Sequence, residues 1–158
     1  MPDIADALFL DDQNSEPIGE KFVVFTLGDE LFAISADEVS EVIQPLDITS
    51  LPNIPDWILG ITSLRGEIVS VIHLPKLWQI PTLTKFTKPK LIILRQNNLL
   101  IALAADKLNE MVFLTEDSIQ PCEKNSYFIA NTFHNNKSLQ IINTQKLFSK
   151  INSVVWLP

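Results

Sequence analysis

Two segments of this 158-residue chain repeat one pattern. Residues 21–43 align without a gap on residues 90–112, an offset of 69 residues (from 21 to 90). The matched features are apolar runs, Phe22–Phe25 with Leu91–Leu94, and turn residues, Gly28-Asp29 with Asn97-Asn98. The match continues further along the chain at an offset of 70 residues, where Val71–His73 aligns with Ile141–Asn143 and Lys76–Trp78 aligns with Lys146–Phe148. Such self-similarity predicts two copies of one small structural unit.

The first copy has the pattern of short β-strands. Phe22–Leu27 and Leu31–Ile34 are apolar runs separated by turn residues, which predicts an antiparallel hairpin. Ser35–Glu38 has the S-x-x-E form of a helix capping box. The residues that follow fit either a helix, with Val39, Val42 and Ile43 on one face, or a strand, in which Val39, Glu41 and Ile43 alternate. Gln44–Trp57 contains three prolines and is expected to be a loop.

A second hairpin is expected between Gly60 and Trp78. Two apolar runs flank Arg65-Gly66-Glu67, and Gly66 can take the positive φ that a tight turn needs. Before it, Pro55–Gly60 is expected to form one helical turn that ends at Gly60. After it, Ile68–Leu74 is expected to be a strand buried on both faces.

The end of this strand is marked by Pro75, which cannot donate to a ladder, and Lys76–Trp78 is then expected to form a helical turn. His73 is interpreted as a strand-end residue with its ring at the surface. Trp57, before the hairpin, is expected to cover the core.

The predicted elements indicate a mainly β protein with one small closed barrel in each half. A unit of about 65 residues is marginal alone, so the two barrels should pack side by side. We expect an acidic, disordered arm over residues 1–19 and one domain over 20–158. Within that domain, we expect two subdomains, over about 20–87 and 88–148, and a C-terminal extension over 149–158. The apolar residues 154–158 of this extension are expected to form a strand or a tail packed on the body.

Charge and composition exclude several classes. The net charge is −7, and residues 1–20 contain six acidic residues and no Lys or Arg. A near-neutral body with an acidic arm does not fit a nucleic-acid partner, which requires a basic face. The single cysteine, Cys122, excludes an internal disulfide and CxxC metal sites. No apolar run reaches the roughly 20 residues of a membrane helix, so we expect a cytoplasmic protein.

Catalytic motifs are not found in the sequence. His73 and His134 lie in different copies, with no acidic or nucleophilic partner at a characteristic spacing. There is no glycine-rich phosphate loop, HExxH or GxSxG motif. We therefore expect no enzyme activity, no catalytic residues, no cofactor and no metal.

The order Gly60, Ile61, Leu64-Arg65-Gly66 and Ile68–Leu74 resembles the CheW-like adaptor family of bacterial chemosensory systems. The resemblance covers Glu20 to Asp117 and extends more faintly to Phe148. It implies a mainly β fold of two tandem small five-stranded SH3-like β-barrels, packed side by side with short helical turns. His73 departs from the pattern, because the family usually has aspartate there.

The resemblance also implies a function. Such a protein is a non-enzymatic adaptor that couples chemoreceptor signalling tips to a CheA-type histidine kinase, peripheral to membrane receptor arrays and without direct membrane insertion. Motif matching assigns receptor contact to Val39, Glu41, Gly60, Leu64 and Arg65. The resemblance also favours a single turn followed by a strand over residues 39–43, in which Glu41 points outward. We further expect an ion pair between Glu41 and Arg65. Two alternatives remain: a stand-alone double-barrel module that binds peptides or ligands outside receptor arrays, and a hydrolase with an unfamiliar site.

Overall fold

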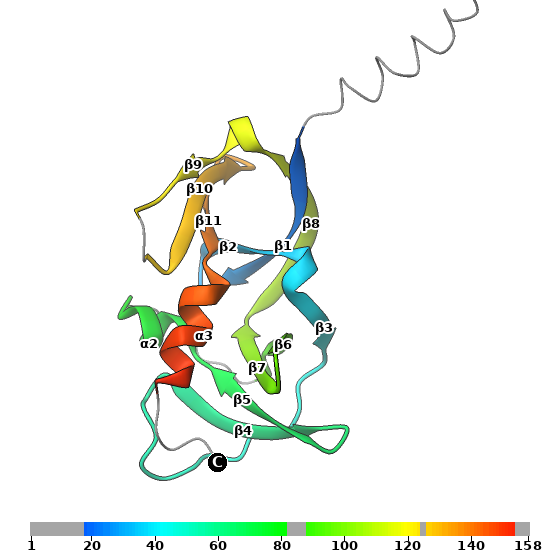
Figure 1. The fold of residues 1–158 in the computed structure, drawn as a ribbon, viewed down its shortest axis with the longest axis vertical. Coiled ribbons are helices and arrows are strands. Elements are labelled where there is room, and N and C mark those ends of the chain that lie inside the picture. The colour runs from blue at the N-terminus through cyan, green and yellow to red at the C-terminus, as the bar shows by residue number, and fades with distance from the viewer. Residues whose placement is uncertain (1–17, 82–87, 124–125, 154–158) are drawn as a thin grey trace, which may run out of the picture.

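The computed structural model describes residues 18–81, 88–123 and 126–153 (Figure 1). The acidic arm up to residue 17 and the apolar residues 154–158 lie outside the described residues. The strands are β1 (Gly19–Leu27), β2 (Glu30–Ser35), β3 (Val39–Ile43), β4 (Ile58–Leu64), β5 (Glu67–Ile72), β6 (Lys90–Gln96), β7 (Leu99–Ala105), β8 (Lys107–Thr115), β9 (Gln120–Pro121), β10 (Phe128–His134) and β11 (Lys137–Ile142). The helices are α2 (Leu74–Trp78) and α3 (Thr144–Asn152), with 3-10 turns η1 (Ala36–Glu38) and η2 (Glu116–Ser118).

The strands form two sheets, which confirms the predicted mainly β, two-barrel fold. The first sheet has the order β8-β1-β2-β11-β10-β9, and the second has the order β3-β6-β7-β5-β4. The first contains six strands, where five were expected, because the two-residue β9 pairs with β10. Each sheet has one parallel pair, β2 with β11 and β5 with β7.

The predicted repeat occupies equivalent places in the two sheets. Ala33 of β2 is opposite Ile141, and Ala102, its match in β7, is opposite Val71, the match of Ile141. The pairing of β1 with β8 and that of β6 with β3 correspond in the same way, and each contains one register shift. The two halves of the chain therefore build the same sheet twice, in the same register.

The predicted subdomain boundaries are wrong, because the two halves exchange their first hairpins. The β1–β2 hairpin of the first half pairs with β8 and β11 of the second half. The β6–β7 hairpin of the second half pairs with β3 and β5 of the first. Residues 20–87 and 88–148 thus each contribute strands to both sheets.

Apolar side chains fill three clusters. One lies inside the first sheet and includes Phe22 and Val24, and another lies inside the second and includes Val69 and Val71. The largest lies between the sheets, where Phe25 and Phe32 meet helix residues such as Leu77 and Phe148. The sequences of these strands are almost continuously apolar because the strands are buried on both faces. Figure 1 shows α2 and α3 beside the seam between the two sheets.

Several local expectations are corrected. Ser35 does not cap η1 with its side chain, and its hydroxyl instead donates to Glu20 Oε2 at 2.7 Å. Residues 58–60 are the start of β4 and not the end of a helical turn. The arm boundary at residue 19 is too late, because Gly19 pairs with Thr115. The extension was placed from residue 149, but α3 continues through that position to Asn152.

Burial also differs from expectation at two positions of the central hairpin. The predicted doubly buried strand begins at Val69, because Ile68 is 61% exposed. His73, expected at the surface, is only 5% exposed. Its side chain caps α2, with Nδ1 accepting a hydrogen bond from Lys76 N at 3.2 Å. Trp57 is buried against the central cluster, as expected.

Candidate functional site

A two-residue turn presents the arginine of the Leu-Arg-Gly segment. Leu64 pairs with Glu67, so only Arg65 and Gly66 form the loop between β4 and β5. Both have positive φ, 50° and 84°, as a type I′ turn requires. Glycine is needed at the second position for its backbone conformation and not for space, because a Cβ there would have no neighbour within 4 Å.

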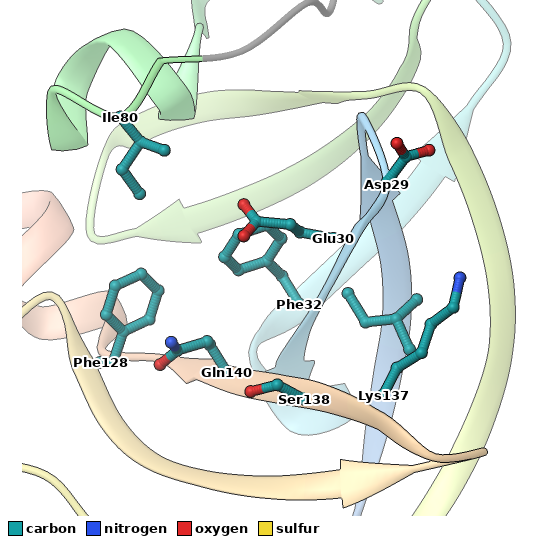
Figure 2. A pocket seen from close by; sticks show the side chains of 9 residues that line it. Asp29, Glu30, Phe32, Ile80, Phe128, Lys137, Ser138 and Gln140 are labelled. Carbon is teal, nitrogen blue, oxygen red and sulfur yellow. The ribbon is translucent and has the colours of Figure 1, made fainter.

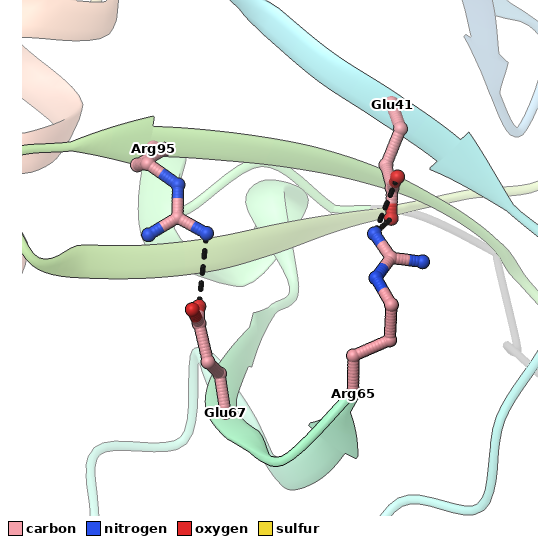
Figure 3. Close-up of polar contacts among 4 residues, drawn as sticks. All are labelled: Glu41, Arg65, Glu67 and Arg95. Atoms are coloured by element: carbon pink, nitrogen blue, oxygen red, sulfur yellow. Dashed lines mark hydrogen bonds and ion pairs between the residues drawn. The ribbon is translucent and has the colours of Figure 1, made fainter.

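The turn brings Arg65 to Glu41 of β3, and the predicted ion pair is present (Figure 3). Arg65 Nη2 donates to both carboxylate oxygens of Glu41, with a distance of 2.6 Å to Oε2. The Arg65 side chain is 70% exposed and that of Glu41 is 30% exposed. Within the part of the chain that the structure describes, Nη1 and Nε of Arg65 make no hydrogen bond and remain available to a partner.

A second ion pair lies beside the first. Arg95 Nη2 of β6 donates to Glu67 Oε2 of β5 at 2.9 Å. Figure 3 shows the four side chains around the end of the β4–β5 hairpin. Both pairs connect strands that are not neighbours in the sheet: β3 and β4 are its two edges, and β7 lies between β5 and β6. The pairs therefore span one end of the barrel that the second sheet forms, called here the second barrel, just as the first sheet forms the first barrel. They lie over a cavity of about 50 Å³ that Glu41, Leu64, Arg65 and Arg95 help to line.

The structure brings three of the five predicted site residues together. Glu41, Leu64 and Arg65 line the same cavity, whereas Val39 and Gly60 do not. Val39 is half-buried and packs against the central cluster. Gly60 is buried, with φ 150°, and a Cβ on it would lie 2.2 Å from the Thr49 carbonyl oxygen. Gly60 therefore holds the adjoining loop and offers no side chain to a partner.

Sequence reasoning missed the neighbouring ion pair of Arg95 with Glu67 and an equivalent pair in the first sheet. His134 Nε2 lies 2.8 Å from Glu110 Oε1. Glu110 aligns with Glu41 in the repeat, and His134 lies next to Asn135, which aligns with Arg65. The repeated glutamate was the signal available in the sequence.

Two titratable groups near the helices have shifted pKa values. Burial lowers the pKa of His73, and the positive charge of Lys76 lowers it further. Burial raises the pKa of Tyr127. Among the described residues, no group of three or more His, Cys, Asp and Glu side chains is arranged to hold a metal ion. No helix within them has the length and apolar character required to cross a membrane.

Comparisons with known proteins agree on one family. The model of the CheW-like domain matches residues 21–152. The chemotaxis protein CheW of Klebsiella aerogenes is 28% identical over 118 residues, which cover 75% of this chain and 71% of that protein. The CheW of Helicobacter pylori is 26% identical over 101 residues, which cover 64% of this chain and 61% of that one.

A solved structure has the same fold. The scaffolding protein TtCheW from Thermoanaerobacter tengcongensis superimposes with a TM-score of 0.72 at 30% sequence identity. The superposition covers 82% of this chain and 87% of that chain. The likeness therefore includes both barrels and not only the central hairpin.

Proposed function

Because the chain belongs to the family of CheW-like domains, we propose that it is a non-enzymatic adaptor in bacterial chemosensory signal transduction. It couples the signalling tips of methyl-accepting receptors to a CheA-type histidine kinase, in the cytoplasm beside the receptor array. The observation that carries this proposal is the family match across both barrels, together with an exposed arginine at the hairpin tip.

An adaptor requires separate surfaces held at a fixed relative angle. The exchange of hairpins supplies this rigidity, because each half of the chain contributes strands to both barrels. A single buried cluster, which includes Phe25, Phe32, Ile92 and Leu94, also joins the two sheets. Partners bound to different barrels would therefore be held in one relative orientation.

The receptor surface is assigned to the second barrel. Receptor tips are helical hairpins, and a helix is bound through apolar contacts with a polar rim. Leu64 and Val39 are the partly exposed apolar residues of the assigned set, and Arg65 is its cation. Glu41 restrains Arg65 through Nη2 only, so the other nitrogens can donate to a carboxylate or carbonyl of the receptor helix. Gly60 shapes the surface without contacting the partner.

The kinase surface is assigned to the first barrel. Large apolar side chains are exposed there on two strands near its edges: Met111 and Phe113 on β8, and Ile129 and Phe133 on β10. Exposed apolar side chains of this size are available for contact with a protein partner. Separate surfaces on the two barrels would let one molecule bind receptor and kinase at the same time.

A binding titration separates the adaptor from the alternative of a stand-alone module outside receptor arrays, which the comparisons do not favour. Helical receptor-tip hairpins and the last domain of the kinase are each titrated against the chain by isothermal calorimetry. An adaptor binds both with micromolar Kd, as is typical of small transient interfaces. Failure to bind either one at millimolar concentration would contradict the proposal.

A further inference from the structure

One face of the first sheet changes from apolar to polar at its end beside the β1–β2 turn. Gln140 of β11 is opposite Phe32 of β2 in the parallel pair. Side chains two residues apart lie on the same face of a strand, so Glu30 and Ser138 share this face. Because Phe32 belongs to the apolar cluster between the sheets, the face is turned toward the seam.

A pocket of about 360 Å³ opens on this face and is called here the β2 pocket (Figure 2). Its apolar wall consists of Phe32, Phe128 and Ile80. The rings of Phe32 and Phe128 are stacked with their centroids 6.0 Å apart, and the ring of Trp78 lies 4.7 Å from that of Phe128. A pocket of this volume, with an aromatic wall and a few polar groups, has the character of a small-molecule site.

The polar wall of the β2 pocket carries three hydrogen-bond acceptors: the Glu30 carboxylate, the Gln140 side-chain carbonyl and the Ser138 hydroxyl. Within the described part of the chain, none of these three side chains has a hydrogen-bond or ion-pair partner. A primary ammonium group has three N–H donors and one positive charge, so it is complementary to this set.

The charges in the pocket are also separated. Figure 2 shows the Glu30 carboxylate beside the Phe32 ring, whereas Lys137 extends on the side of Asp29. The face of an aromatic ring carries partial negative charge, as a carboxylate carries a full one. Both therefore attract a cation to the aromatic side of the pocket.

The aligned pocket of the second sheet lacks both features. This β7 pocket has a volume of about 530 Å³ and lies where the β6–β7 turn meets β5. Leu99 aligns with Glu30, and Ile68 aligns with Ser138. Among the described residues that line the β7 pocket, none is charged or aromatic. The carboxylate and the aromatic wall therefore belong to one pocket and are not a consequence of the repeated fold.

We propose that the β2 pocket binds a small organic cation, namely a primary amine with an aromatic or apolar body. The ammonium group donates to the three acceptors of the polar wall, and the body packs against Phe128 and Ile80. The described residues that line this pocket differ from those that line the cavity below Arg65. The site is therefore separate from the one assigned to the receptor.

Titration of the isotope-labelled chain with phenethylammonium, followed by nuclear magnetic resonance, tests this proposal. We expect the amide signals of Glu30 and Ser138 and the indole N–H signal of Trp78 to shift, with a Kd of about 1 mM or below. Glu30→Gln keeps the shape but removes the charge, and it should weaken binding at least about fivefold.

The matched control is Asp29→Asn, which copies the aligned Asn98 and removes the same charge from the other side of the pocket. It should leave the Kd within about twofold of the parent, because it is not part of the polar wall. Circular dichroism should show that both variants are folded. An unchanged Kd in Glu30→Gln, or an equal loss of affinity in the two variants, would overturn the proposal.

Control ligands test the chemistry of the site. Phenethyl alcohol is neutral, hydrocinnamate is an anion, and N-acetyllysine methylamide represents a lysine of a protein partner. Each should bind at least about fivefold more weakly than phenethylammonium, because the first two lack the cation and the third lacks the ring. Equal or tighter binding of any of them would overturn the proposal. Shifts of equal size at Leu99 and Ile68 of the β7 pocket would show non-specific binding and would also overturn it.

Discussion

At the scale of single residues, Arg65 and Arg95 provide a comparison within one surface. Both are exposed arginines paired with a glutamate, and both line the same cavity. Only Arg65 lies at the tip of a hairpin, next to Leu64. Exposed ion pairs contribute about 0–1 kcal/mol to stability, so neither arginine is required for folding.

Replacement of these arginines therefore tests the receptor site. Arg65→Ala should weaken binding to receptor tips by about thirtyfold, the loss of roughly 2 kcal/mol expected for an interface hot spot. Its Tm should change by less than about 3 °C, since the lost pair is exposed. Arg95→Ala is the control and should leave the affinity within about threefold. Equal affinities of parent and Arg65→Ala would remove Arg65 from the site.

His73 gives a second prediction at this scale. Its neutral ring caps α2 through Nδ1, and burial, with a further contribution from Lys76, lowers its pKa, whereas Asp56 and Asp106 act in the opposite direction. The pKa is lower in the folded than in the unfolded protein, where it is about 6.5. As the pH falls below that value, the unfolded state binds the proton first and the folded state loses stability.

The aligned residue of the second half supplies the control. Asn143 caps α3 in the same way, with Oδ1 accepting from Lys146 N at 3.1 Å. His73→Asn should keep the cap and lose the titration. We expect the Tm of the parent to fall by about 2–4 °C more than that of His73→Asn between pH 7.5 and pH 5, for a cap worth about 1 kcal/mol. Parallel pH profiles of Tm for parent and variant would contradict this role.

At the scale of elements, the central hairpin depends on two glycines for different reasons. Gly60 has φ 150° and no room for a Cβ beside the Thr49 carbonyl, where two hydrogen bonds join Thr49 to Ile61. Gly66 has φ 84° and open space around it. Alanine at position 60 would therefore meet both backbone strain and a steric clash, whereas alanine at position 66 would meet backbone strain alone.

Alanine substitutions should separate these effects. Gly66→Ala should cost about 1 kcal/mol, a Tm decrease of about 2–4 °C. Gly60→Ala should cost more than about 3 kcal/mol, because backbone strain and the displacement of Thr49 add together. Thermal unfolding followed by circular dichroism measures both. A Gly60→Ala protein as stable as Gly66→Ala would show that the loop at Thr49 adapts easily, and would contradict the role of Gly60 in holding that loop.

The elements themselves were largely predictable from the sequence. Apolar runs and turn residues locate β1, β2, β4 and β5, since burial and turn geometry leave local patterns. Residues 58–60 were misassigned because proline and glycine mark a helical turn and a bulged strand in the same way. His73 was misplaced because a buried capping residue cannot be distinguished by its spacing from an exposed one.

At the scale of the whole molecule, the exchange of hairpins could not be predicted. The two copies have the same local pattern, so β1–β2 could pair equally well within its own half or with the other half. The choice is made by long-range packing. The same limitation hid Arg95, because its approach to Glu67 depends on β6 and β5 belonging to one sheet. By contrast, the pair between Arg65 and Glu41 was predicted, because the resemblance to the CheW-like family implied that residues at these two positions act together.

The central claim is that one chain bridges receptor and kinase. The most direct measurement is co-sedimentation of the kinase with membranes that contain receptors, with and without this protein. We predict that the parent brings the kinase into the pellet, that Arg65→Ala brings down several-fold less, and that Arg95→Ala behaves like the parent. Kinase sedimentation that is the same with and without the protein would contradict the account.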